Sequence, residues 1–582
     1  MVLIVGTRCF MTAKKPGPAL IAAGISAGLV LAGCTAADPE GGGPRGEVVF
    51  AEVVPFPDNL FPIIGAGESQ SAANILVRIL PSAFRILPDF SVAHDPELLT
   101  EAPTLDEVAG KQVNVYTINP DAVWSDGEPI TVDDFAFTAK VQDAEFVEAC
   151  PDGGVLGTFG YDQIESIEGS DDGKTVTVTY STPYADWQAL FTLLPAHLLD
   201  SEDDAELCAT VTAGWPTGQG LPDDISGGPW RLEAKNIDVP GQLVTLTPNE
   251  NYWGRQPHLA ALTHQIIGAA PNAAFSGLEN GEVQYVAAPP VLDLVQQVAG
   301  LAPNVNSDIV FGLRFEHLDF NTRNPHLADV NVRRAFGLAL DRQEIVDQTV
   351  AQFSEDAQVL NNRIWFNTQP QYQDAAPEEY NSPDVVAGRA LLEESGYALG
   401  ADGVYAHPER GRLSLAISTL WNDRPRLDII NVIIPQAAKV GFEVVARPDE
   451  DLFNDASFAT SLEAGGYDIA LFAWIGGPFQ SGSAGIYRSL EAQGGMQGQN
   501  YTHGGNPEVD ALYEEFLREP DPDARAELGN RIDALLWEDL YTIPLYQQPT
   551  LFAYSADLRG VEGNASHSGP LWNSETWTLT QP

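Results

Sequence analysis

Basic residues, cysteines and long apolar runs are all scarce in this chain of 582 residues. Its 30 lysines and arginines stand against 81 aspartates and glutamates, which gives a net charge of −51, and only seven of the 30 are lysine. This balance excludes nucleic acid as a partner, because binding to a phosphate backbone requires clustered cations. The acidity favours a solvated surface, and the alternatives are adaptation to high salt or attraction of cationic ligands.

The spacings that catalytic and metal sites use are missing as well. None of the nine histidines occurs in an H-x-x-x-H or H-x-H pattern, and we find no nucleophile with an evident base. The match to a nucleophile elbow at Gly24 to Gly28 lies within the apolar part of a predicted signal peptide. We therefore expect no enzymatic activity, no metal and no cofactor.

The predicted signal peptide ends at a cysteine. The apolar stretch from Ala19 to Ala32 follows Lys14 and Lys15 and closes with Leu-Ala-Gly before Cys34. A basic start, a short apolar run and a small-residue exit are typical of a secretory signal, and the run is too short to span a bilayer comfortably. The pattern resembles a bacterial lipobox, in which Cys34 carries a diacylglycerol and becomes the mature N-terminus. The alternative is an ordinary signal peptide with a chance cysteine, and Met11 is a possible true start.

The segment after the cysteine indicates a tether. Residues 34–46 are small, polar and rich in glycine and proline, with too little apolar surface to fold. No later run is apolar enough to cross a membrane. We therefore expect the globular part to sit at the outer face of the cytoplasmic membrane, attached by lipid.

The remaining cysteines predict a disulfide. Cys9 leaves with the signal peptide and Cys34 is the lipid site, so Cys150 and Cys208 remain as an even pair in an oxidising compartment. Neither lies in a C-x-x-C motif, which makes a redox or metal role a poor alternative.

Length and pattern predict an α/β chain of several domains. About 530 residues follow the tether, more than one compact core usually holds. Strands are expected at 48–54, 113–118, 413–418 and 469–473, a hairpin at 164–180, and helices at 69–80 and after Thr131. A helix through Val332 and Phe336 should bury its apolar face, and Arg333 and Arg334 beside it are expected to pair with nearby acids. Strands and helices alternate throughout, which favours mixed sheets.

Six short motifs occur in the order in which one known family carries them. They are Trp124-Ser-Asp-Gly with Thr131-x-x-Asp-Phe135, Ser226-Gly-Gly-Pro-Trp230, Asn249-Glu-Asn-Tyr-Trp-Gly254, Gly277 to Val283, Phe320 to Arg342, and Asn506-Pro-Glu-Val-Asp510. Over about residues 48–560 the chain resembles the peptide/nickel-type extracellular solute-binding proteins, family 5, of ABC importers.

The resemblance implies a fold and a division of the chain. The expected fold is α/β, periplasmic-binding-protein-like type II (cluster C), with two lobes around a cleft and an extra domain. Residues 1–33 are then the signal peptide, 47–78, 228–310 and 547–582 lobe I, 79–227 the extra domain and 311–546 lobe II. Cys150 and Cys208 would both lie in the extra domain, consistent with a local disulfide.

Loops at strand ends carry ligand contacts in such a fold. The main candidate loop follows the strand at 469–473 and holds Trp474, Gly476, Gly477 and Phe479. Oligopeptide-binding relatives have an Asp here that holds the ligand's α-ammonium, and this chain has the two glycines in its place. Core packing is the alternative role for Trp474. Weaker candidates, with exposed loops as the alternative, are Phe56, Trp421, Asn422, Asp423, Asn500 and Tyr501, of which Asp423 is the candidate replacement for the missing acid.

These features together predict a function. We expect a monomeric, lipid-anchored receptor that captures an oligopeptide outside the cell and delivers it to an ABC permease. One alternative is another solute, such as an oligosaccharide or an opine-like compound, because Trp421, Trp474 and Phe479 can stack on sugar faces. Another is a non-transport envelope lipoprotein that uses the same fold to bind an envelope component or a partner protein.

Overall fold

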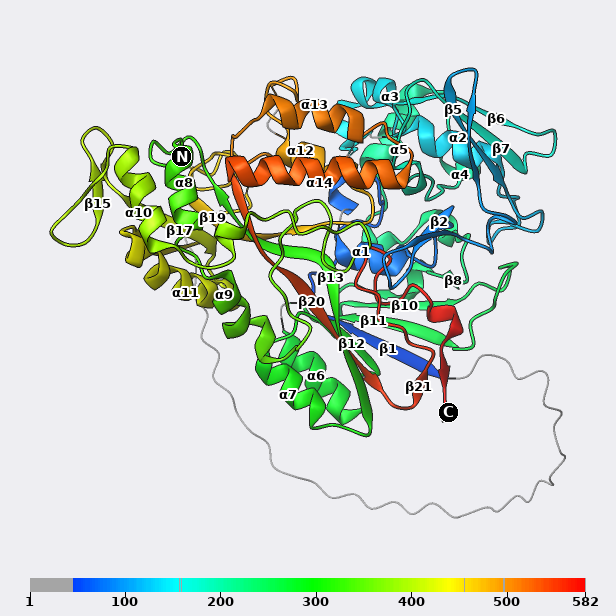
Figure 1. The fold of residues 1–582 in the computed structure, drawn as a ribbon. Coiled ribbons are helices and arrows are strands. Elements are labelled where there is room, and N and C mark those ends of the chain that lie inside the picture. The colour runs from blue at the N-terminus through cyan, green and yellow to red at the C-terminus, as the bar shows by residue number, and fades with distance from the viewer. Residues whose placement is uncertain are drawn as a thin grey trace, which may run out of the picture. The chain divides into compact units, whose positions relative to one another are not determined.

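Two long strands, β13 (Val305–Phe320) and β20 (Thr542–Ser555), run antiparallel to each other through the middle of an eleven-stranded sheet (Figure 1). The computed structural model describes residues 46–580 except 68, 156, 159, 269, 455, 496 and 497. From Pro44 onward the chain forms one compact unit. Cys34, the signal peptide and almost the whole tether lie outside the described residues.

The main sheet has a fixed strand order. Along the sheet this order is β18 (Glu443–Asp449), β17 (Ser414–Leu420), β19 (Ile469–Ile475), β13, β20, β12 (Tyr285–Ala288), β1 (Glu47–Glu52), β11 (Ala261–Ile266), β10 (Leu243–Pro248) and β8 (Trp230–Arg231), with β9 (Ile237–Asp238) paired to β10.

β13 and β20 divide this sheet into two parts. We call β12, β1, β11, β10, β9 and β8 half-sheet I, β17, β18 and β19 half-sheet II, and β13 and β20 the linking strands. β20 pairs with β12, β13 pairs with β19, and the linking strands pair with each other over nearly their whole length. β1 is parallel to β11 and β12, and β17 is parallel to β18 and β19. The linking strands thus connect the two half-sheets.

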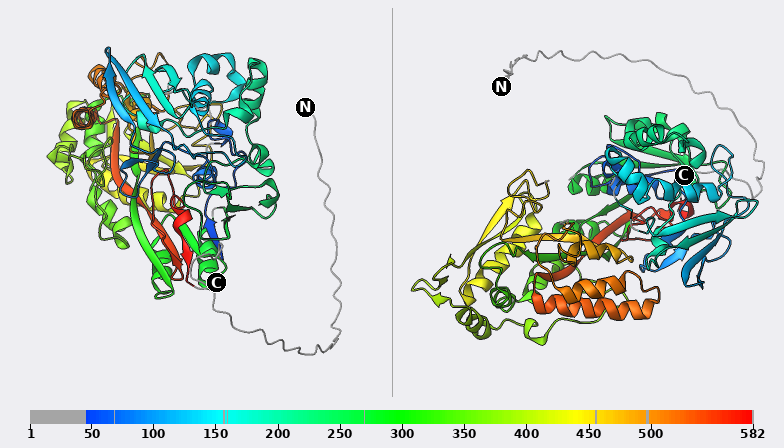
Figure 2. Two further views of the ribbon diagram at one scale, coloured as in Figure 1. Left: turned by 90° about the vertical axis from the view of Figure 1, so that its right-hand side faces the viewer. Right: turned by 90° about the horizontal axis from the view of Figure 1, so that it is seen from above.

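A smaller antiparallel sheet lies apart from the main one, drawn in blue and cyan in Figure 2. Its order is β4 (Thr104–Val108), β5 (Lys111–Thr117), β7 (Thr175–Tyr180) and β6 (Ile164–Gly169). Side chains of β5 and β7 alternate between buried and half-buried, as expected for a sheet with one face on the core. Cys150 and Cys208 beside this sheet form a disulfide, with Cα atoms 5.6 Å apart.

Three short strand groups and the helices complete the fold. The short groups are β2 (Phe84–Ile86) with β3 (Val92–His94), β14 (Ala398–Leu399) with β15 (Tyr405–His407) and β16 (Gly411–Arg412), and β21 (Leu558–Arg559) with β22 (Thr578–Leu579). The α-helices are α1 (Gln70–Leu76), α2 (Val132–Lys140), α3 (Ala144–Ala149), α4 (Ala196–Leu199), α5 (Asp204–Ala213), α6 (Pro271–Asn280), α7 (Leu292–Ala299), α8 (Val330–Gly337), α9 (Arg342–Gln348), α10 (Val385–Glu394), α11 (Arg424–Val440), α12 (Ala484–Tyr487), α13 (Pro507–Phe516) and α14 (Pro522–Asp539). No helix in the described part of the chain is long and apolar enough to cross a membrane.

Two large hydrophobic cores hold these elements. One joins half-sheet I to the small sheet and to α1 and α2, and the other joins half-sheet II to α8, α10 and α11. Val332 and Phe336 of α8 are fully buried in the second core, which confirms the predicted apolar face.

Local sequence signals fixed most element types. The strands expected at 48–54, 113–118, 413–418 and 469–473 are β1, β5, β17 and β19, and every end lies within two residues of its expected position. Thr131 caps α2 in a capping box with Asp134. The helix expected at 69–80 has its N-cap at Ser69 but ends at Leu76, and beyond it the carbonyls of Arg78 and Ile79 accept from the backbone of Trp230 and Gly227.

One expected pairing was wrong. Arg333 and Arg334 do not bind carboxylates. Arg333 donates to the carbonyl oxygens of Asp539 and Leu327, and Arg334 donates to that of Glu538. Glu538 and Asp539 are the last residues of α14, whose final carbonyls have no partner within the helix and carry its negative end. The arginines therefore cap a helix C-terminus.

Candidate ligand-binding site

The strand ends of both half-sheets meet at one place. Ala288, at the end of β12, is opposite Leu551 of β20, which is opposite Ile309 of β13. Ile475, at the end of β19, is opposite Arg314 of β13. The carboxyl ends of parallel strands in both half-sheets therefore face each other across a short piece of the linking strands, and ligands of open α/β sheets bind outside such ends.

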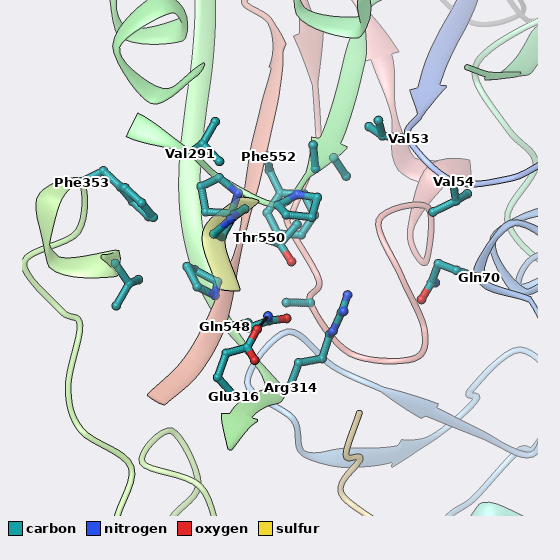
Figure 3. A pocket seen from close by; sticks show the side chains of 18 of the residues that line it. Val53, Val54, Gln70, Val291, Arg314, Glu316, Phe353, Gln548, Thr550 and Phe552 are labelled. Carbon is teal, nitrogen blue, oxygen red and sulfur yellow. Dashed lines mark hydrogen bonds between the residues drawn. The ribbon is translucent and has the colours of Figure 1, made fainter. Parts of the chain in front are cut away.

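A pocket of 550 Å³ lies at this place, on one face of the linking strands (Figure 3). Half-sheet I and its loops contribute Phe50, Glu52, Val53, Val54, Ala287 to Leu292 and, from α1, Gln70 and Asn74. The half-sheet II side contributes Gln348 to Val350, Gln352, Phe353, Asp423, Pro425, Arg426 and Asp428. The linking strands supply Arg314, Glu316, Tyr546, Gln548 to Thr550 and Phe552, and residues between 564 and 570 close one side.

A buried charge network forms part of the pocket wall. Nε of Arg426, in the first turn of α11, lies 3.1 Å from both carboxylate oxygens of Glu316, and its Nη1 lies 3.0 Å from Oδ2 of Asp423. Gln548 also donates to Glu316, whose side chain is 3% exposed. Burial works against the charged form, but the attraction of Glu316 and Asp423 outweighs it and raises the pKa of Arg426. These groups satisfy one another.

Arg314 is the other cation that lines the pocket, and it is not part of this network. Where three residues of β13 stand opposite one residue of β20, the strand bulges, and Arg314 extends from the bulge into the pocket beside Glu316 and Gln548 (Figure 3). Its guanidinium makes no hydrogen bond or ion pair with any residue that the structure describes. Water reaches it, yet the surrounding walls remove enough solvent to lower the pKa of Arg314, and Arg426 adds to this effect.

Glu52 places a further carboxylate at the end of β1. It is buried, and one of its oxygens accepts a hydrogen bond of 2.5 Å from Nδ2 of Asn74. The other oxygen has no hydrogen-bond partner among the described residues and lies 3.9 Å from Nδ1 of the buried His264.

Of the residues predicted to bind ligand, Asp423 lines this pocket. It is also the N-cap of α11, where it accepts from the backbone of Arg426. Trp421 and Asn422 are exposed in the turn just before it. Phe56 is half-buried against the first core, and it is Val53 and Val54 of the same loop that line the pocket.

Trp474 lies on the other face of the sheet. It is opposite Phe315, whereas its neighbour Ile475 is opposite Arg314, and adjacent residues of a strand point to opposite faces. The half-buried Trp474 ring stacks between His317 and Tyr501, at centroid distances of 5.7 and 5.8 Å. Its indole Nε1 is buried without a hydrogen-bond partner among the described residues. Core packing and ligand contact thus remain compatible for this ring.

The rest of the predicted loop borders the pocket. Ile475 is 60% exposed beside Arg314. Gly476 donates to the carbonyl of Leu313 at 2.6 Å, so close that a β-carbon would clash with this oxygen. Gly477 approaches His567, whose neighbours Ala565 and Ser566 line the pocket. Phe479 is half-buried further along the loop.

Asn500 and Tyr501 are used within their own loop. The buried Asn500 donates to the carbonyls of Arg488 and Gly504 and accepts from Thr502. The Tyr501 carbonyl accepts from the Tyr467 hydroxyl, and its ring covers Trp474.

The residues that sequence reasoning missed are Arg314, Glu316, Arg426 and Gln548. Arg314 and Glu316 left one signal, because they alternate with the apolar Leu313 and Phe315 along the strand. Nothing in the sequence indicated that Arg426, 110 residues away, would meet Glu316.

Comparison with known proteins agrees with this architecture. The family model for the middle part of the bacterial extracellular solute-binding proteins, family 5, matches residues 96–496. The chain belongs to this family. It is therefore a solute-binding protein of the ABC importer type, with the two-lobed type II periplasmic-binding fold.

Individual relatives extend the comparison over most of the chain. The oligopeptide-binding protein OppA of Mycobacterium tuberculosis is 28% identical over 511 residues, covering 86% of this chain and 80% of its own. An uncharacterized lipoprotein of the same organism is 24% identical over 554 residues, covering 88% and 90%. The solved structure of the periplasmic EDTA-binding protein EppA has a TM-score of 0.83 and 28% identity, covering 93% and 97%.

Arg426→Ala is expected to destabilise this solute-binding protein by about 3–5 kcal/mol, because Glu316 would keep a buried charge without its ion pair. Arg424→Ala is the matched control on the same helix. Its side chain is 80% exposed and pairs with Asp428, so the loss should stay within about 0.5 kcal/mol. Chemical denaturation measures both, and equal losses in the two variants would contradict a structural role for the buried pair.

Trp474→Ala should weaken ligand binding by about 2 kcal/mol or more if the ring is a ligand contact, and its stacking adds a loss of stability. Trp474→Phe keeps an aromatic ring between His317 and Tyr501 but removes the unpartnered N–H together with part of the indole. We expect it to lose less stability than Trp474→Ala and, if the N–H is a ligand contact, to bind ligand about fivefold more weakly. Binding by Trp474→Ala at wild-type affinity would show that the ring serves packing alone.

Proposed function

We propose that this protein is a lipid-anchored receptor that captures oligopeptides outside the cell and hands them to an ABC permease. The observation that carries the proposal is a pocket lined by both half-sheets and floored by the two strands that link them. A ligand that touches both sides stabilises the closed arrangement over the open one, so closure reports occupancy to a permease.

The division into lobes is part of this proposal. We place lobe I at 47–78, 228–310 and 547–582, the extra domain at 79–227 and lobe II at 311–546. In support, the limits 310/311 and 546/547 fall inside the linking strands, next to the bulge that begins after Phe311. A bulged pair of strands is a physically suitable place for the small backbone changes of a hinge.

The ligand site is proposed to run from the pocket over the ends of β13 and β19 to the loop at 475–480. Its walls are largely apolar, with a few polar groups at fixed positions, as binding pockets for small molecules usually are. OppA, by its printed name, binds oligopeptides, and its similarity to most of this chain supports the peptide as ligand.

An aminopolycarboxylate is a second candidate ligand. EppA, by its printed title, binds EDTA, and it resembles this chain over nearly its whole length. The unpaired Arg314 in the pocket is the observation that favours this class too, because a guanidinium pairs well with a carboxylate.

The peptide proposal is tested by calorimetry with a pool of hexapeptides in free and N-acetylated forms. We expect micromolar or tighter binding and little effect of acetylation, because Gly476 and Gly477 replace the acid that holds an ammonium. A large loss on acetylation that Asp423→Asn removes would place the amine at Asp423. A large loss that this variant leaves intact would contradict the position of the pocket, and native mass spectra without any bound peptide, together with no heat of binding, would contradict the peptide itself.

Lipid anchoring is tested at Cys34, which lies outside the described residues. Cys34→Ala should abolish lipidation and release the protein from the membrane fraction, because no other anchor is predicted. Mass spectrometry of the mature N-terminus and fractionation measure this. Unchanged membrane retention with no lipid on the N-terminus would refute the lipobox.

A further inference from the structure

The charged side chains that line the pocket differ in whether they have ion-pair partners. They are Glu52, Arg314, Glu316, Asp423, Arg426 and Asp428. The guanidinium of Arg426 forms ion pairs with Glu316 and Asp423, and Asp428 pairs with Arg424. Glu316 has Arg426 and Gln548 on its carboxylate. Among the described residues that line the pocket, Arg314 alone is a cation without an ion-pair partner.

The position of Arg314 makes it accessible to a ligand. Arg314 projects from the bulge of β13 at the junction of the half-sheets, and its neighbour across the strand is the exposed Ile475. Figure 3 shows the guanidinium directed into the pocket. A ligand that reaches Arg314 therefore lies on the linking strands, where the two half-sheets join.

The chemistry of the pocket selects the group that binds there. A guanidinium is a planar fork of donors that matches the two oxygens of a carboxylate. The pocket offers it a partly desolvated position, where an ion pair is stronger than in water. Glu316 and Gln548 lie beside it, and elsewhere the pocket is lined by apolar side chains that include Val53, Val291, Phe353 and Phe552. A ligand that fits has a carboxylate joined to an apolar body.

We propose that Arg314 is the specificity-determining residue of this site and pairs with a carboxylate of the ligand. The inference rests on the proposed function, because it concerns the same pocket. The carboxylate has two possible sources, the C-terminus of a peptide or an arm of an aminopolycarboxylate. The inference predicts that a ligand without its free carboxylate binds more weakly.

The test compares purified wild-type protein with Arg314→Gln and Arg314→Lys. The probes are one hexapeptide pool as free acids, the same pool as C-terminal amides, and Fe(III)-EDTA, measured by calorimetry. Arg424→Gln is the matched control, an exposed arginine near the pocket whose loss should leave affinity unchanged. Arg314 is exposed, so thermal unfolding should be unaffected in its variants.

We expect amidation to weaken binding to the wild type by about tenfold or more, the typical effect of losing a charge-assisted hydrogen bond. Arg314→Gln should weaken binding of the free acids by a similar factor and should no longer distinguish them from amides. Arg314→Lys should lie between, because it keeps the charge but loses the fork.

The outcomes separate this inference from the proposed function. Peptides that bind the wild type equally as acids and amides would overturn the role of Arg314 and leave the peptide function standing. Binding of Fe(III)-EDTA alone, weakened by Arg314→Gln, would overturn the peptide and support the carboxylate. Discrimination between acids and amides that persists in Arg314→Gln would overturn the inference, as would the absence of any Arg314-dependent binding.

Discussion

The pairing of β13 with β20 is the constraint on which the rest of the structure depends. These strands are the connection between the sheets of the two halves, and their register fixes which strand ends face each other. Without a bulge, the side chains of β13 would alternate regularly between the two faces of the sheet. The bulge after Phe311 interrupts this alternation, and Arg314 projects at the junction. Two carbonyls of the bulge are hydrogen-bonded, one from each side. Gly476 donates to Leu313 from one neighbour strand and Gln547 donates to Gly312 from the other. The bulge carbonyls of Gly312 and Leu313 therefore both have hydrogen-bond partners, and the candidate site lies at the same place as the connection between the halves.

Buried ion pairs then tie distant segments to this frame. Arg426 of α11 reaches Glu316 on β13, and Arg525 of α14 pairs with Asp186 near the small sheet, where the second Asp186 oxygen accepts from the backbone of Ser481 at 2.7 Å. Such pairs add little net stability, because desolvation offsets most of their attraction. Their effect is directional, since a buried charge that loses its partner is strongly unfavourable. They restrict how the segments can sit against each other, and the Asp186 pair does so between the segment proposed as the extra domain and the one proposed as lobe II.

The sequence predicted the local elements and the family better than it predicted the binding site. Thr131 indicated a helix start through capping chemistry that acts within three residues, and the structure places N-caps there and at Ser69, the first residue of the other predicted helix. Arg333 and Arg334 were misjudged because their partners are the last carbonyls of α14, and no sequence pattern identifies a carbonyl 206 residues away as an acceptor. The charged residues on β13 and Arg426, which line the pocket together with the predicted Asp423, were missed for the same reason. Trp474 stands out in a sequence as a large exposed aromatic candidate, whereas Arg314 and Glu316 become a site only once β13 bulges and α11 brings Arg426 beside them. Register and tertiary pairing, which depend on contacts far apart in the chain, decide that outcome.

The net charge of the whole chain affects which ligands reach the unpaired Arg314. A net charge of −51 produces a field that repels anions on approach, but at physiological salt this field decays over about 8 Å. Inside the pocket only the nearest groups act, and there Arg426, Glu316 and Asp423 are paired while Arg314 is not. A zwitterionic peptide carries no net charge, so it escapes the long-range repulsion and still presents a carboxylate at short range. A polyanionic chelate presents the same carboxylate but must first approach against the field. If the proposed contact with Arg314 forms, one carboxylate pairing serves both candidate ligands, and the acidic surface around the pocket favours the ligand whose charges cancel.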